Sequence, residues 1–422
     1  MKAAVSYGNS RPEVIRIPSS KSLTHRALIA AALAEGESVI HSPAFNRDTE
    51  ATIEALRKLN VSMHAGDDAV TVSGKADLSA YDGSVIDCHE SGSTLRFLIP
   101  LFASSGKPCR FTGQGKLMER PLSVYEEIYG SSGVFVLKDR VLTVQGRSDG
   151  TEYRLKGNVS SQFVSGLLFV LPLQDHDSRI ELLEPVESLS YIDMTIDVLR
   201  MAQIDVCRKE NTIFIRGNQR YQPFSCRIAG DDSQAAFFIM QALMADRTVR
   251  IAGIDPDSRQ GDHVIVRVAE NCGAEISWEE DIMTIRPKGL RPLNADLKDC
   301  PDLGPVLFAA AACCPQTSRF TGVARLRLKE SDRISSMKAE LEKTGCLFEE
   351  TENEVRIVGN SDLPGGYCFD GHNDHRIVMA LAVLASCLKE PSLIEGADAV
   401  GKSYPDFFED LKKTGAEVKL YD

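Results

Sequence analysis

The sequence predicts an α/β fold built from six similar units that are divided between two domains. Three observations predict it: the length of the chain, a repeat of about 70 residues, and the alternation of β-like and helix-like segments within each repeat. At 422 residues the chain is too long for one ordinary core and suits two domains of roughly 200 residues each. A sequence repeat of fixed period indicates a fold assembled from equivalent units.

The second half of each repeat ends in a hairpin-like pattern. A helix-like segment precedes two short β segments that a charged turn joins, as in "ALRKLNVSMHAGDDAVTVSG" and "ELEKTGCLFEETENEVRIVG". Five such segments, 70 to 72 residues apart, end at Gly74, Gly146, Gly217, Pro287 and Gly359. A sixth copy, "DLKKTGAEVKLYD", runs to the last residue, so the repeat accounts for nearly the whole chain.

The first half of each repeat carries a strongly apolar helix that follows a polar patch, as in "SSKSLTHRALIAAALA" and "NDHRIVMALAVLA". Equivalent positions, spaced by 69 to 72 residues, are Ser20, Gly92, Ser161, Asp232, Asp302 and Asp374. Because these helices are apolar on nearly all sides, we expect them to be buried, with only the polar first turn reaching a surface. A second polar loop and an amphipathic outer helix then follow in each repeat.

Each unit is therefore predicted to run strand, buried helix, strand, loop, outer helix and β-hairpin. A solenoid is the alternative, but solenoid repeats usually have 20 to 50 residues, so two domains of three units are preferred. The last unit ends on a strand without a following partner, and the N-terminal "KAAVSY" is expected to complete it. One domain would then be discontinuous, with residues 1–14 and 227–422, and the other would comprise residues 15–226.

Composition indicates a water-soluble protein without a nucleic-acid or membrane partner. Hydrophobic residues make up 43% of the chain, charged residues 26%, and the formal net charge is −12, which disfavours non-specific binding to nucleic acid or anionic lipid. The N-terminal segment lacks the apolar region of a signal peptide, and no apolar run is long enough to span a membrane. The eleven cysteines contain no CxxC pair, which favours reduced thiols and a cytoplasmic location.

Cations crowd the first turns of the buried helices, where the positive end of the helix dipole makes a carboxylate the more favourable neighbour. Lys21, His25 and Arg26 show this in the first helix. Helix N-termini bind anions, so several of them facing one cleft would suit a substrate with more than one phosphate or carboxylate. Cations at the repeat positions are Lys21, Arg26, Arg96, Arg120, Lys329, Arg333, Arg376 and Lys402, accompanied by the neutral donors Ser22, Ser160, Ser161 and Gln162. Singly, each could be a solvated charge or a helix cap; together they predict a polyanion site.

Acidic residues occupy some of the same positions. Asp232, Asp332 and Asp374 are expected to be N-caps. Asp302 and Glu330 belong to a unit whose polar positions are cationic, so either could transfer a proton there.

Other common site patterns lack support. His372 and His375 have no third metal ligand at suitable spacing, so no metal site is expected. The sequence also contains no GxGxxG, no GxxxxGK[ST] and no nucleophile elbow.

A set of motifs, in order along the chain, resembles the 5-enolpyruvylshikimate-3-phosphate synthase family, the 3-phosphoshikimate 1-carboxyvinyltransferases. The motifs are "SSKSLTHRAL", "ESGSTLRFL", "MERPLS", "SSQFVSGLL", "YIDMTIDVL", "PDLGPVLFAAA", "KESDRI", "NDHRIVMAL" and "GKSYPDFF". The resemblance implies two domains, each an inside-out α/β barrel of three βαβαββ units, with the active site in the cleft between the domains.

The resemblance also implies a reaction of the shikimate pathway to chorismate and the aromatic amino acids. The enolpyruvyl group of phosphoenolpyruvate passes to the 5-hydroxyl of shikimate 3-phosphate, and phosphate is released. Residues carried over to the shikimate 3-phosphate side are Lys21, Ser22, Arg26, Ser160, Ser161, Gln162, Ser188, Tyr191, Asp302 and Lys329. Those carried over to the phosphoenolpyruvate side are Lys21, Gly92, Arg120, Gln162, Arg333, Arg376 and Lys402.

The same resemblance assigns catalytic roles. Asp302 is the base for the 5-hydroxyl, Glu330 the acid that protonates the methylene carbon, and Lys21 and Lys402 stabilise the phosphate-bearing intermediate. No metal or organic cofactor is implied, and the small-molecule substrates are the only expected partners of a monomeric cytoplasmic enzyme that is a target of glyphosate.

Glu90, Ser93 and Arg325 depart from the commoner family pattern, and Glu90 puts the affinity for phosphoenolpyruvate and glyphosate in doubt. The nearest alternative is the enolpyruvyl transferase that acts on UDP-N-acetylglucosamine. That family usually has a Cys in the loop where "TGQGKLMERP" has Gln114. RNA 3′-phosphate cyclase, which shares the unit architecture, and a non-catalytic repeat scaffold are weaker alternatives.

Overall fold

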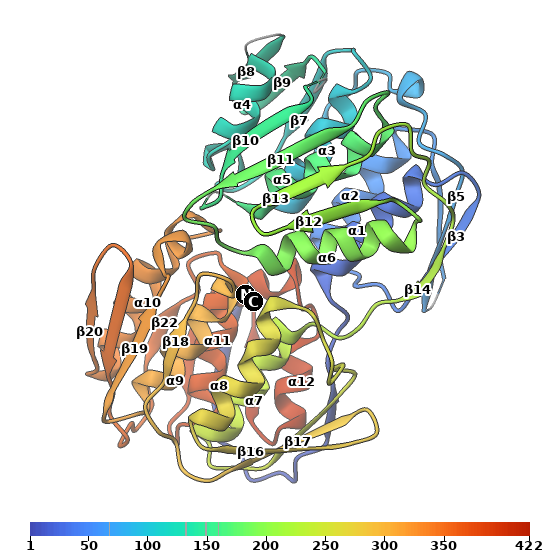
Figure 1. The fold of residues 1–422 in the computed structure, drawn as a ribbon. Coiled ribbons are helices and arrows are strands. Elements are labelled where there is room, and N and C mark those ends of the chain that lie inside the picture. The colour runs from blue at the N-terminus through green and yellow to red at the C-terminus, as the bar shows by residue number, and fades with distance from the viewer. Residues whose placement is uncertain (67, 131–132, 148–149, 159) are drawn as a thin grey trace. The chain divides into compact units, whose positions relative to one another are not determined.

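The computed structural model describes the chain of 422 residues except for residues 67, 131–132, 148–149 and 159. The chain forms two compact units (Figure 1). Unit 1 comprises Met1–Pro18 and Ala229–Asp422, and unit 2 comprises Ser19–Ile228. In the part of the chain that is described, no helix is long and apolar enough to cross a membrane.

Four-stranded sheets with one shared topology are the repeating feature of both units. In each sheet the first two strands are parallel, and the third and fourth each run antiparallel to their predecessor. In unit 2 the sheets are β14 (Ser225–Arg227), β3 (Glu37–His41), β5 (Ala69–Ser73) and β4 (Ser62–Ala65); β6 (Ile86–Asp87), β7 (Cys109–Thr112), β9 (Val141–Gln145) and β8 (Val134–Lys138); and β10 (Glu152–Lys156), β11 (Ser178–Leu183), β13 (Thr212–Ile215) and β12 (Val206–Lys209). In unit 1 they are β2 (Val14–Arg16), β15 (Val249–Ala252), β17 (Ile282–Pro287) and β16 (Ala274–Glu279); β18 (Asn294–Asp296), β19 (Thr317–Thr321), β21 (Glu354–Val358) and β20 (Leu347–Glu350); and β22 (Cys368–Asp370), β23 (Ser392–Glu395), β1 (Lys2–Ser6) and β24 (Glu417–Tyr421).

Two sets of helices accompany these sheets. The buried helices are α1 (Lys21–Leu33), α3 (Gly92–Ala103) and α5 (Ser161–Val170) in unit 2, and α7 (Asp232–Met244), α9 (Gly304–Ala312) and α11 (His375–Ala385) in unit 1. The outer helices are α2 (Arg47–Arg57), α4 (Ser123–Gly130), α6 (Leu189–Met201), α8 (Val264–Asn271), α10 (Arg333–Leu341) and α12 (Phe407–Lys413). The α/β fold of repeated units, predicted from the 70-residue period, is thus confirmed.

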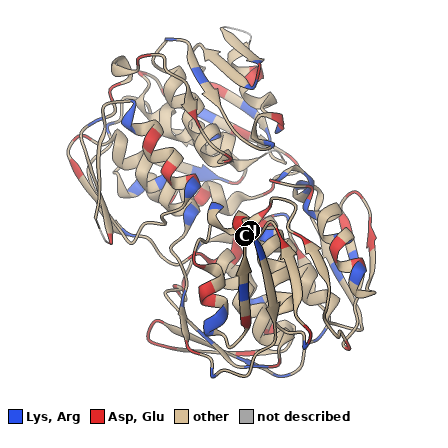
Figure 2. Ribbon diagram, turned by 180° about the vertical axis from the view of Figure 1, so that it is seen from behind, with Lys and Arg blue, Asp and Glu red and all other residues tan. Residues whose placement is uncertain are grey.

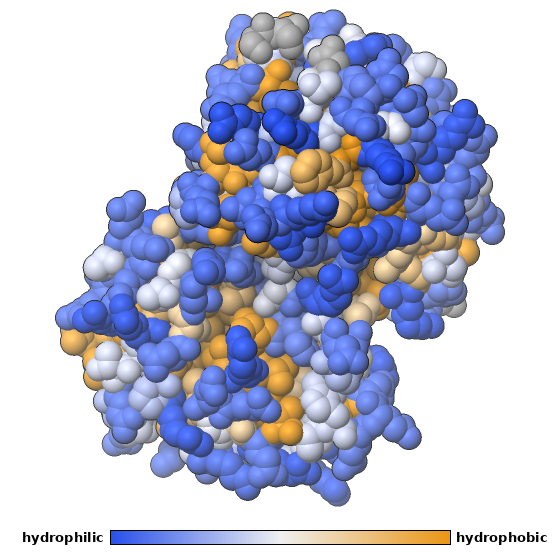
Figure 3. All heavy atoms as spheres, in the orientation of Figure 1, coloured by the Kyte–Doolittle hydropathy of each residue, from blue (hydrophilic) through white to orange (hydrophobic). Residues whose placement is uncertain are grey.

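Each unit has its own hydrophobic core, formed largely by the helices that the sequence predicts to be buried. All nine residues of α9 are buried, as the composition "GPVLFAAAA" requires of a helix without a polar face. Within each unit the buried helices lie inside and the sheets outside (Figure 1). The outer surfaces are mainly hydrophilic on the face shown in Figure 3, and acidic and basic residues are mixed over both units (Figure 2).

The first and last segments of each unit are joined by long-range pairing. β1 lies between β23 and β24 and pairs antiparallel with both, so "KAAVSY" completes the last repeat as expected. β2 precedes α1 in sequence but pairs with β15 of unit 1, and β14 precedes α7 but pairs with β3 of unit 2. Each link between the units therefore follows a strand that belongs to the unit the chain is leaving.

Serine and aspartate side chains begin most of the buried helices. The N-caps, whose side chains accept backbone N–H bonds, are Ser20, Ser91, Ser160, Asp231 and Asp374 for α1, α3, α5, α7 and α11. Asp332 caps the outer helix α10. The predictions for Asp332 and Asp374 are confirmed, whereas the prediction for Asp232 is wrong, because its neighbour Asp231 has the extended backbone of a cap. α9 begins differently, since Asp302 lies in the preceding 3-10 turn η5 (Pro301–Leu303).

Candidate active site

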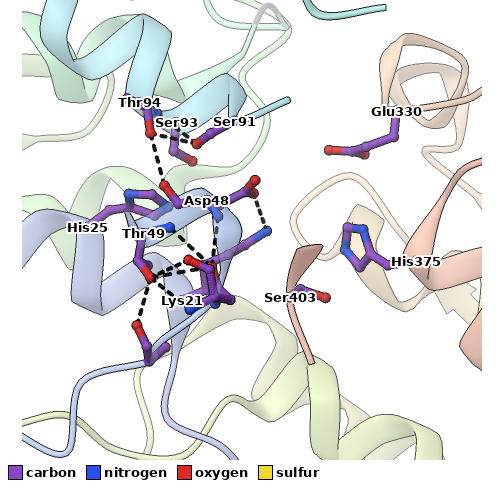
Figure 4. Close-up of polar contacts among 12 residues, drawn as sticks. Lys21, His25, Asp48, Thr49, Ser91, Ser93, Thr94, Glu330, His375 and Ser403 are labelled. Carbon is purple, nitrogen blue, oxygen red and sulfur yellow. Dashed lines mark hydrogen bonds and ion pairs between the residues drawn. The ribbon is translucent and has the colours of Figure 1, made fainter. Parts of the chain in front are cut away.

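Lys21, at the first position of α1, lies beside a carboxylate of unit 2. Its Nζ is 2.9 Å from Oδ2 of Asp48 in the first turn of α2, and both side chains are largely buried (Figure 4). Asp48 is itself at a helix N-terminus, where the dipole favours negative charge. The pair therefore compensates part of the unfavourable placement of Lys21 on α1.

Arg26 turns inward instead of extending from the helix start. Its buried guanidinium donates to Oγ1 of Thr195 at 2.8 Å, to the carbonyl of Tyr191 at 3.0 Å and to the carbonyl of Ser22 at 2.7 Å, and it lies 5.0 Å from the centre of the Phe97 ring. Burial lowers the pKa of Arg26 to about 10, and the interaction with Tyr191 opposes this only in part. Arg26 thus links α1 to α6 through neutral oxygens.

A buried chain of hydrogen bonds joins the starts of α1, α2 and α3. Nδ1 of His25 lies 2.8 Å from Oγ1 of Thr52, which lies 2.7 Å from Oγ1 of Thr94. Thr94 in turn donates to the Asp48 carbonyl and contacts Oγ of Ser91 (Figure 4). Burial first, and then the charges of Lys21 and Arg26, hold the pKa of His25 well below its ordinary value, so His25 is a neutral member of this chain.

Gly92 begins α3 among three long polar side chains. A Cβ at this position would lie 2.9 Å from Nη1 of Arg96, 3.1 Å from Nη1 of Arg120 and 3.5 Å from Oε1 of Gln162. Nη1 of Arg96 donates to Oε1 of Gln162 at 2.9 Å, and Nε2 of Gln162 donates to Oγ of Ser93 at 3.0 Å. The structure thus brings together the predicted phosphoenolpyruvate residues of unit 2 that lie around the start of α3.

The remaining predicted residues of unit 2 lie at the starts of α5 and α6. Ser160 caps α5 and Ser161 is its buried first residue. Ser188 precedes α6 in the left-handed conformation, with φ of 57°, and Tyr191 lies in the first turn of the same helix. Its carbonyl accepts from Arg26, which connects the α6 start to the α1 start.

In unit 1 a buried arginine stands among three carboxylates. Nη1 of Arg333 lies 2.8 Å from Oδ1 of Asp302, Nη2 lies 2.8 Å from Oε2 of Glu330, and Nε lies 2.9 Å from Oδ2 of Asp374. The Arg333 side chain is 1% exposed and that of Asp374 is 0% exposed. A buried charge of this kind persists only when it is paired, so Arg333 organises the two proposed proton-transfer groups, Asp302 and Glu330.

Asp302 in turn is surrounded by cations. Lys329 Nζ lies 3.1 Å from its Oδ1, and Arg376 Nη2 lies 3.0 Å from its Oδ2, in addition to the contact with Arg333. Burial alone would raise the pKa of the Asp302 carboxyl, but the charges of Arg376, Lys329 and Arg333 outweigh it and hold the pKa well below the ordinary value. The carboxylate is therefore ionised at neutral pH but only weakly basic while these cations surround it.

Lys402, in η8 (Ala397–Lys402), is held by the loop that precedes α11. Its Nζ donates to the carbonyl of Asn373 at 2.7 Å and to Oδ1 of the same residue at 2.9 Å. Nη2 of Arg376, in the first turn of α11, also donates to Oγ of Ser233 at 2.9 Å. The residues just before α11 thus contact Lys402 through Asn373 and Arg333 through Asp374.

Sequence reasoning missed several polar partners of these cations. Asp48 lies in "FNRDTE", the first of the recurring loops, so the repeat could have indicated it. Asp374 is also a repeat position, but its contact with Arg333, 41 residues away, could not be predicted from the repeat. The same holds for the contact of Asn373 with Lys402, 29 residues away.

The cluster in each unit has side chains that suit the binding of anions. Each unit has cations near helix starts, which suit phosphate and carboxylate groups, and unit 1 adds two carboxylates that could transfer protons. Among the residues described, no three His, Cys, Asp or Glu side chains are grouped so as to hold a metal ion.

Comparison with known proteins identifies the family. Residues 9–411 match the family model described as EPSP synthase (3-phosphoshikimate 1-carboxyvinyltransferase). The chain belongs to this family. The resemblance drawn from the sequence motifs is thereby confirmed.

Relatives and solved structures of the EPSP synthase family agree over nearly the full length. The 3-phosphoshikimate 1-carboxyvinyltransferase of Clostridium kluyveri is 42% identical over 410 residues, which cover 96% of this chain and 95% of that protein. That of Clostridium perfringens is 38% identical over 424 residues, which cover 99% of this chain and 100% of that protein. A structure of EPSP synthase from Acinetobacter baumannii superposes with a TM-score of 0.80 at 26% identity, covering 99% of this chain and 100% of that one.

Proposed function

We propose that this EPSP synthase family member transfers the carboxyvinyl group of phosphoenolpyruvate to the 5-hydroxyl of shikimate 3-phosphate and releases inorganic phosphate. The observation that carries the proposal is the family match over residues 9–411, joined by relatives that bear the name of this activity. Both substrates carry a phosphate and a carboxylate, which suits the cations at the helix starts. The UDP-N-acetylglucosamine enolpyruvyl transferase is the less supported alternative.

Both units supply side chains to the proposed reaction. For shikimate 3-phosphate we assign Lys21, Ser22, Arg26, Ser160, Ser161, Gln162, Ser188, Tyr191, Asp302 and Lys329. For phosphoenolpyruvate we assign Lys21, Gly92, Arg120, Gln162, Arg333, Arg376 and Lys402. Arg26 would serve as a cation for the substrate. It also holds the Tyr191 carbonyl in place through a hydrogen bond.

Addition requires one proton to leave oxygen and one to reach carbon. Asp302 takes the proton of the 5-hydroxyl as its oxygen bonds to C2 of phosphoenolpyruvate, and Glu330 gives a proton to C3, which becomes a methyl group. The resulting tetrahedral intermediate carries phosphate and carboxylate. Lys21 and Lys402 stabilise its charge electrostatically.

Elimination then restores the double bond. The C2–O bond to phosphate breaks, a proton leaves the methyl group for Glu330, and the proton held by Asp302 departs with phosphate. The products are the carboxyvinyl ether and inorganic phosphate, and both carboxyl groups return to their starting states. Negative charge arriving beside Arg376 and Lys329 competes with Asp302 for these cations, which raises the basicity of Asp302 when substrate is bound.

We further propose that the protein acts as a cytoplasmic monomer on these small molecules, without a nucleic-acid or membrane partner. The net charge of −12 supports the absence of polyanionic partners.

The choice of acceptor tests the proposed function. We expect the purified protein to release phosphate from phosphoenolpyruvate when shikimate 3-phosphate is present, and not when phosphoenolpyruvate is alone or accompanied by UDP-N-acetylglucosamine. The measurement is a continuous assay of inorganic phosphate with each acceptor in turn. Release of phosphate with UDP-N-acetylglucosamine and none with shikimate 3-phosphate would contradict the proposed function. It would instead identify the protein as a UDP-N-acetylglucosamine enolpyruvyl transferase.

A further inference from the structure

Two consecutive residues before α11 adopt a backbone conformation that side chains disfavour. His372 has φ of 49° and Asn373 has φ of 53°, in the left-handed region. A residue other than glycine adopts this conformation at an energetic cost and persists in it only when its surroundings hold it there. We call residues 370–373 the α11 loop.

A buried carboxylate on α10 holds the α11 loop from one side. Glu340, whose side chain is 3% exposed, accepts hydrogen bonds from Nε2 of His372 at 3.1 Å, from the backbone N–H of Asp370 at 2.9 Å and from Nζ of Lys343 at 2.6 Å. Oδ1 of Asp370 accepts from the backbone N–H of His372 at 2.7 Å. The loop is therefore fixed through both a side chain and its backbone.

The other side of the α11 loop contacts the proposed site directly. The carbonyl and the side-chain oxygen of Asn373 both accept from Nζ of Lys402. The next residue, Asp374, accepts from Nε of Arg333 and caps the helix that carries Arg376. The kink at His372 and Asn373 thus determines where Lys402 finds its two acceptors.

Charge strengthens the contact between His372 and Glu340. The hydrogen bond that His372 donates to Glu340 raises the pKa of His372 above its ordinary value. Burial lowers this pKa, the negative charge of Asp370 raises it, and the positive charge of Lys343 lowers it. Burial would raise the pKa of Glu340, but the hydrogen bonds from His372, Lys343 and the Asp370 backbone outweigh it and lower the pKa. These are the titratable groups that face His372 from β22, α10 and η7 (Glu342–Thr344), and their sum favours an imidazolium paired with a carboxylate.

We propose that His372 is a positioning residue of the carboxyvinyl transfer, which through its contact with Glu340 holds the α11 loop in the conformation that presents both Asn373 oxygens to Lys402. The inference rests on the proposed function, because it takes Lys402 as a residue that binds phosphoenolpyruvate and stabilises the intermediate. The His372 side chain would then act on the reaction indirectly, because the next residue, Asn373, contacts Lys402.

The raised pKa of His372 predicts how the activity changes with pH. Because the pKa of His372 is raised on folding, the charged contact is at full strength below about pH 6.5, the ordinary histidine pKa, and weakens as the pH rises through the higher pKa of the folded protein. We therefore expect kcat/KM for phosphoenolpyruvate to decline at alkaline pH, as His372 loses its proton.

Two variants and a matched control test the proposal. His372→Ala removes the contact, and His372→Gln keeps a hydrogen-bond donor without the charge. His64→Ala changes an exposed histidine on β4 whose Nε2 lies 2.9 Å from Oγ of Ser62. We expect His372→Ala to lower kcat/KM for phosphoenolpyruvate about tenfold, the size of effect expected for a hydrogen bond between charged groups, and to change KM for shikimate 3-phosphate less than about twofold. His372→Gln should recover most of the activity and lose the alkaline decline, and His64→Ala should match the parent protein.

A second readout separates this inference from the proposed function. Labelling with acetic anhydride, followed by mass spectrometry of the peptide that contains Lys402, reports the accessibility of that amine whether or not the protein turns over substrate. We expect more labelling of Lys402 in His372→Ala than in the parent. An inactive parent protein with this labelling difference would overturn the proposed function and leave the positioning of Lys402 supported. A folded His372→Ala with unchanged labelling, kcat/KM and pH profile would overturn the inference, as would equal losses in the Ala and Gln variants.

Discussion

Replacing Asp302 by Asn is expected to lower kcat at least about 100-fold, because general base catalysis contributes roughly 10²–10⁴ to the rate of such steps. Asn has the shape of Asp and can still accept a hydrogen bond from Lys329, so substrate binding should remain measurable. Steady-state phosphate release, with KM determined for each substrate, checks this. An unchanged kcat would show that Asp302 is only a structural partner of the cations around it.

The same variant carries a stability prediction with a defined pH window. Asp302 has a pKa below its unfolded value, so its carboxylate adds stability above the unfolded pKa of about 4, and this stability is lost as the pH falls through the folded pKa. We expect Asp302→Asn to be less stable at pH 7 by an amount on the order of 3 kcal/mol, as for the loss of one partner from a buried ion cluster. Denaturant unfolding should show the difference shrinking below about pH 4.

A surface aspartate provides the control. Asp281 pairs with Arg16 at 3.2 Å, and both side chains are more than half exposed. Asp281→Asn should leave kcat, KM and stability nearly unchanged, since exposed ion pairs contribute little. Equal loss of activity in both variants would point to a general effect of charge and not to the position of Asp302.

Replacing Lys21 by Met is expected to lower kcat roughly 100-fold or more while the protein stays folded. Removal of one preorganised donor to a developing charge has an effect of about this size. The stability change should stay within about 1 kcal/mol, because the variant loses the contact with Asp48 but also removes a cation from the positive end of α1. Thermal melting measured with the same preparations as phosphate release checks both parts.

Lys58→Met is the matched control for Lys21→Met. Lys58 follows α2, and its Nζ donates to Oγ of Ser84 at 2.9 Å, away from the helix starts. The Lys58→Met variant should release phosphate with the kcat of the parent protein. A large drop in melting temperature for Lys21→Met with kcat unchanged would make the Lys21 to Asp48 pair a structural contact and not a catalytic one.

The architecture could be predicted from the sequence because its causes are local. Helices such as "GPVLFAAAA" have no polar face and must be buried. Similar helices recur along the chain at intervals of about 70 residues. The choice of sheet for the short strands could not be predicted in the same way. β2 and β14 have three residues each, and nothing within three residues shows that they pair with β15 and β3, respectively.

The cations of the candidate site could be singled out from the sequence, but most of the side chains that contact them in the structure could not. The sequence shows that Lys21 is a cation at the unfavourable end of α1, but it does not show that Asp48, 27 residues further on, pairs with it. Arg26 is predicted to bind an anion, and nothing in the sequence indicates that its guanidinium also donates to Thr195 and to the Tyr191 carbonyl. Such contacts depend on the packing of separate helices, which no local pattern encodes.

The misassignment of the α7 cap has the same origin. Asp231 and Asp232 are adjacent, and either suits a helix start by composition. Asp232 instead accepts from Ser258 at 2.5 Å and contacts His263 at 3.0 Å, partners from the loop before α8. The local sequence suits Asp231 and Asp232 equally as caps, and the contacts of Asp232 with Ser258 and His263 distinguish the two residues.

The fate of the carbon skeleton of phosphoenolpyruvate tests the central claim most directly. With 13C-labelled phosphoenolpyruvate and shikimate 3-phosphate in D2O, NMR should show the label in a vinyl ether, formed in equal amount to phosphate, with deuterium in its methylene group. Deuterium enters because C3 becomes a methyl group in the intermediate and then loses one of three hydrogens. Label recovered as pyruvate, with phosphate released and no ether formed, would show hydrolysis in place of transfer and contradict the account.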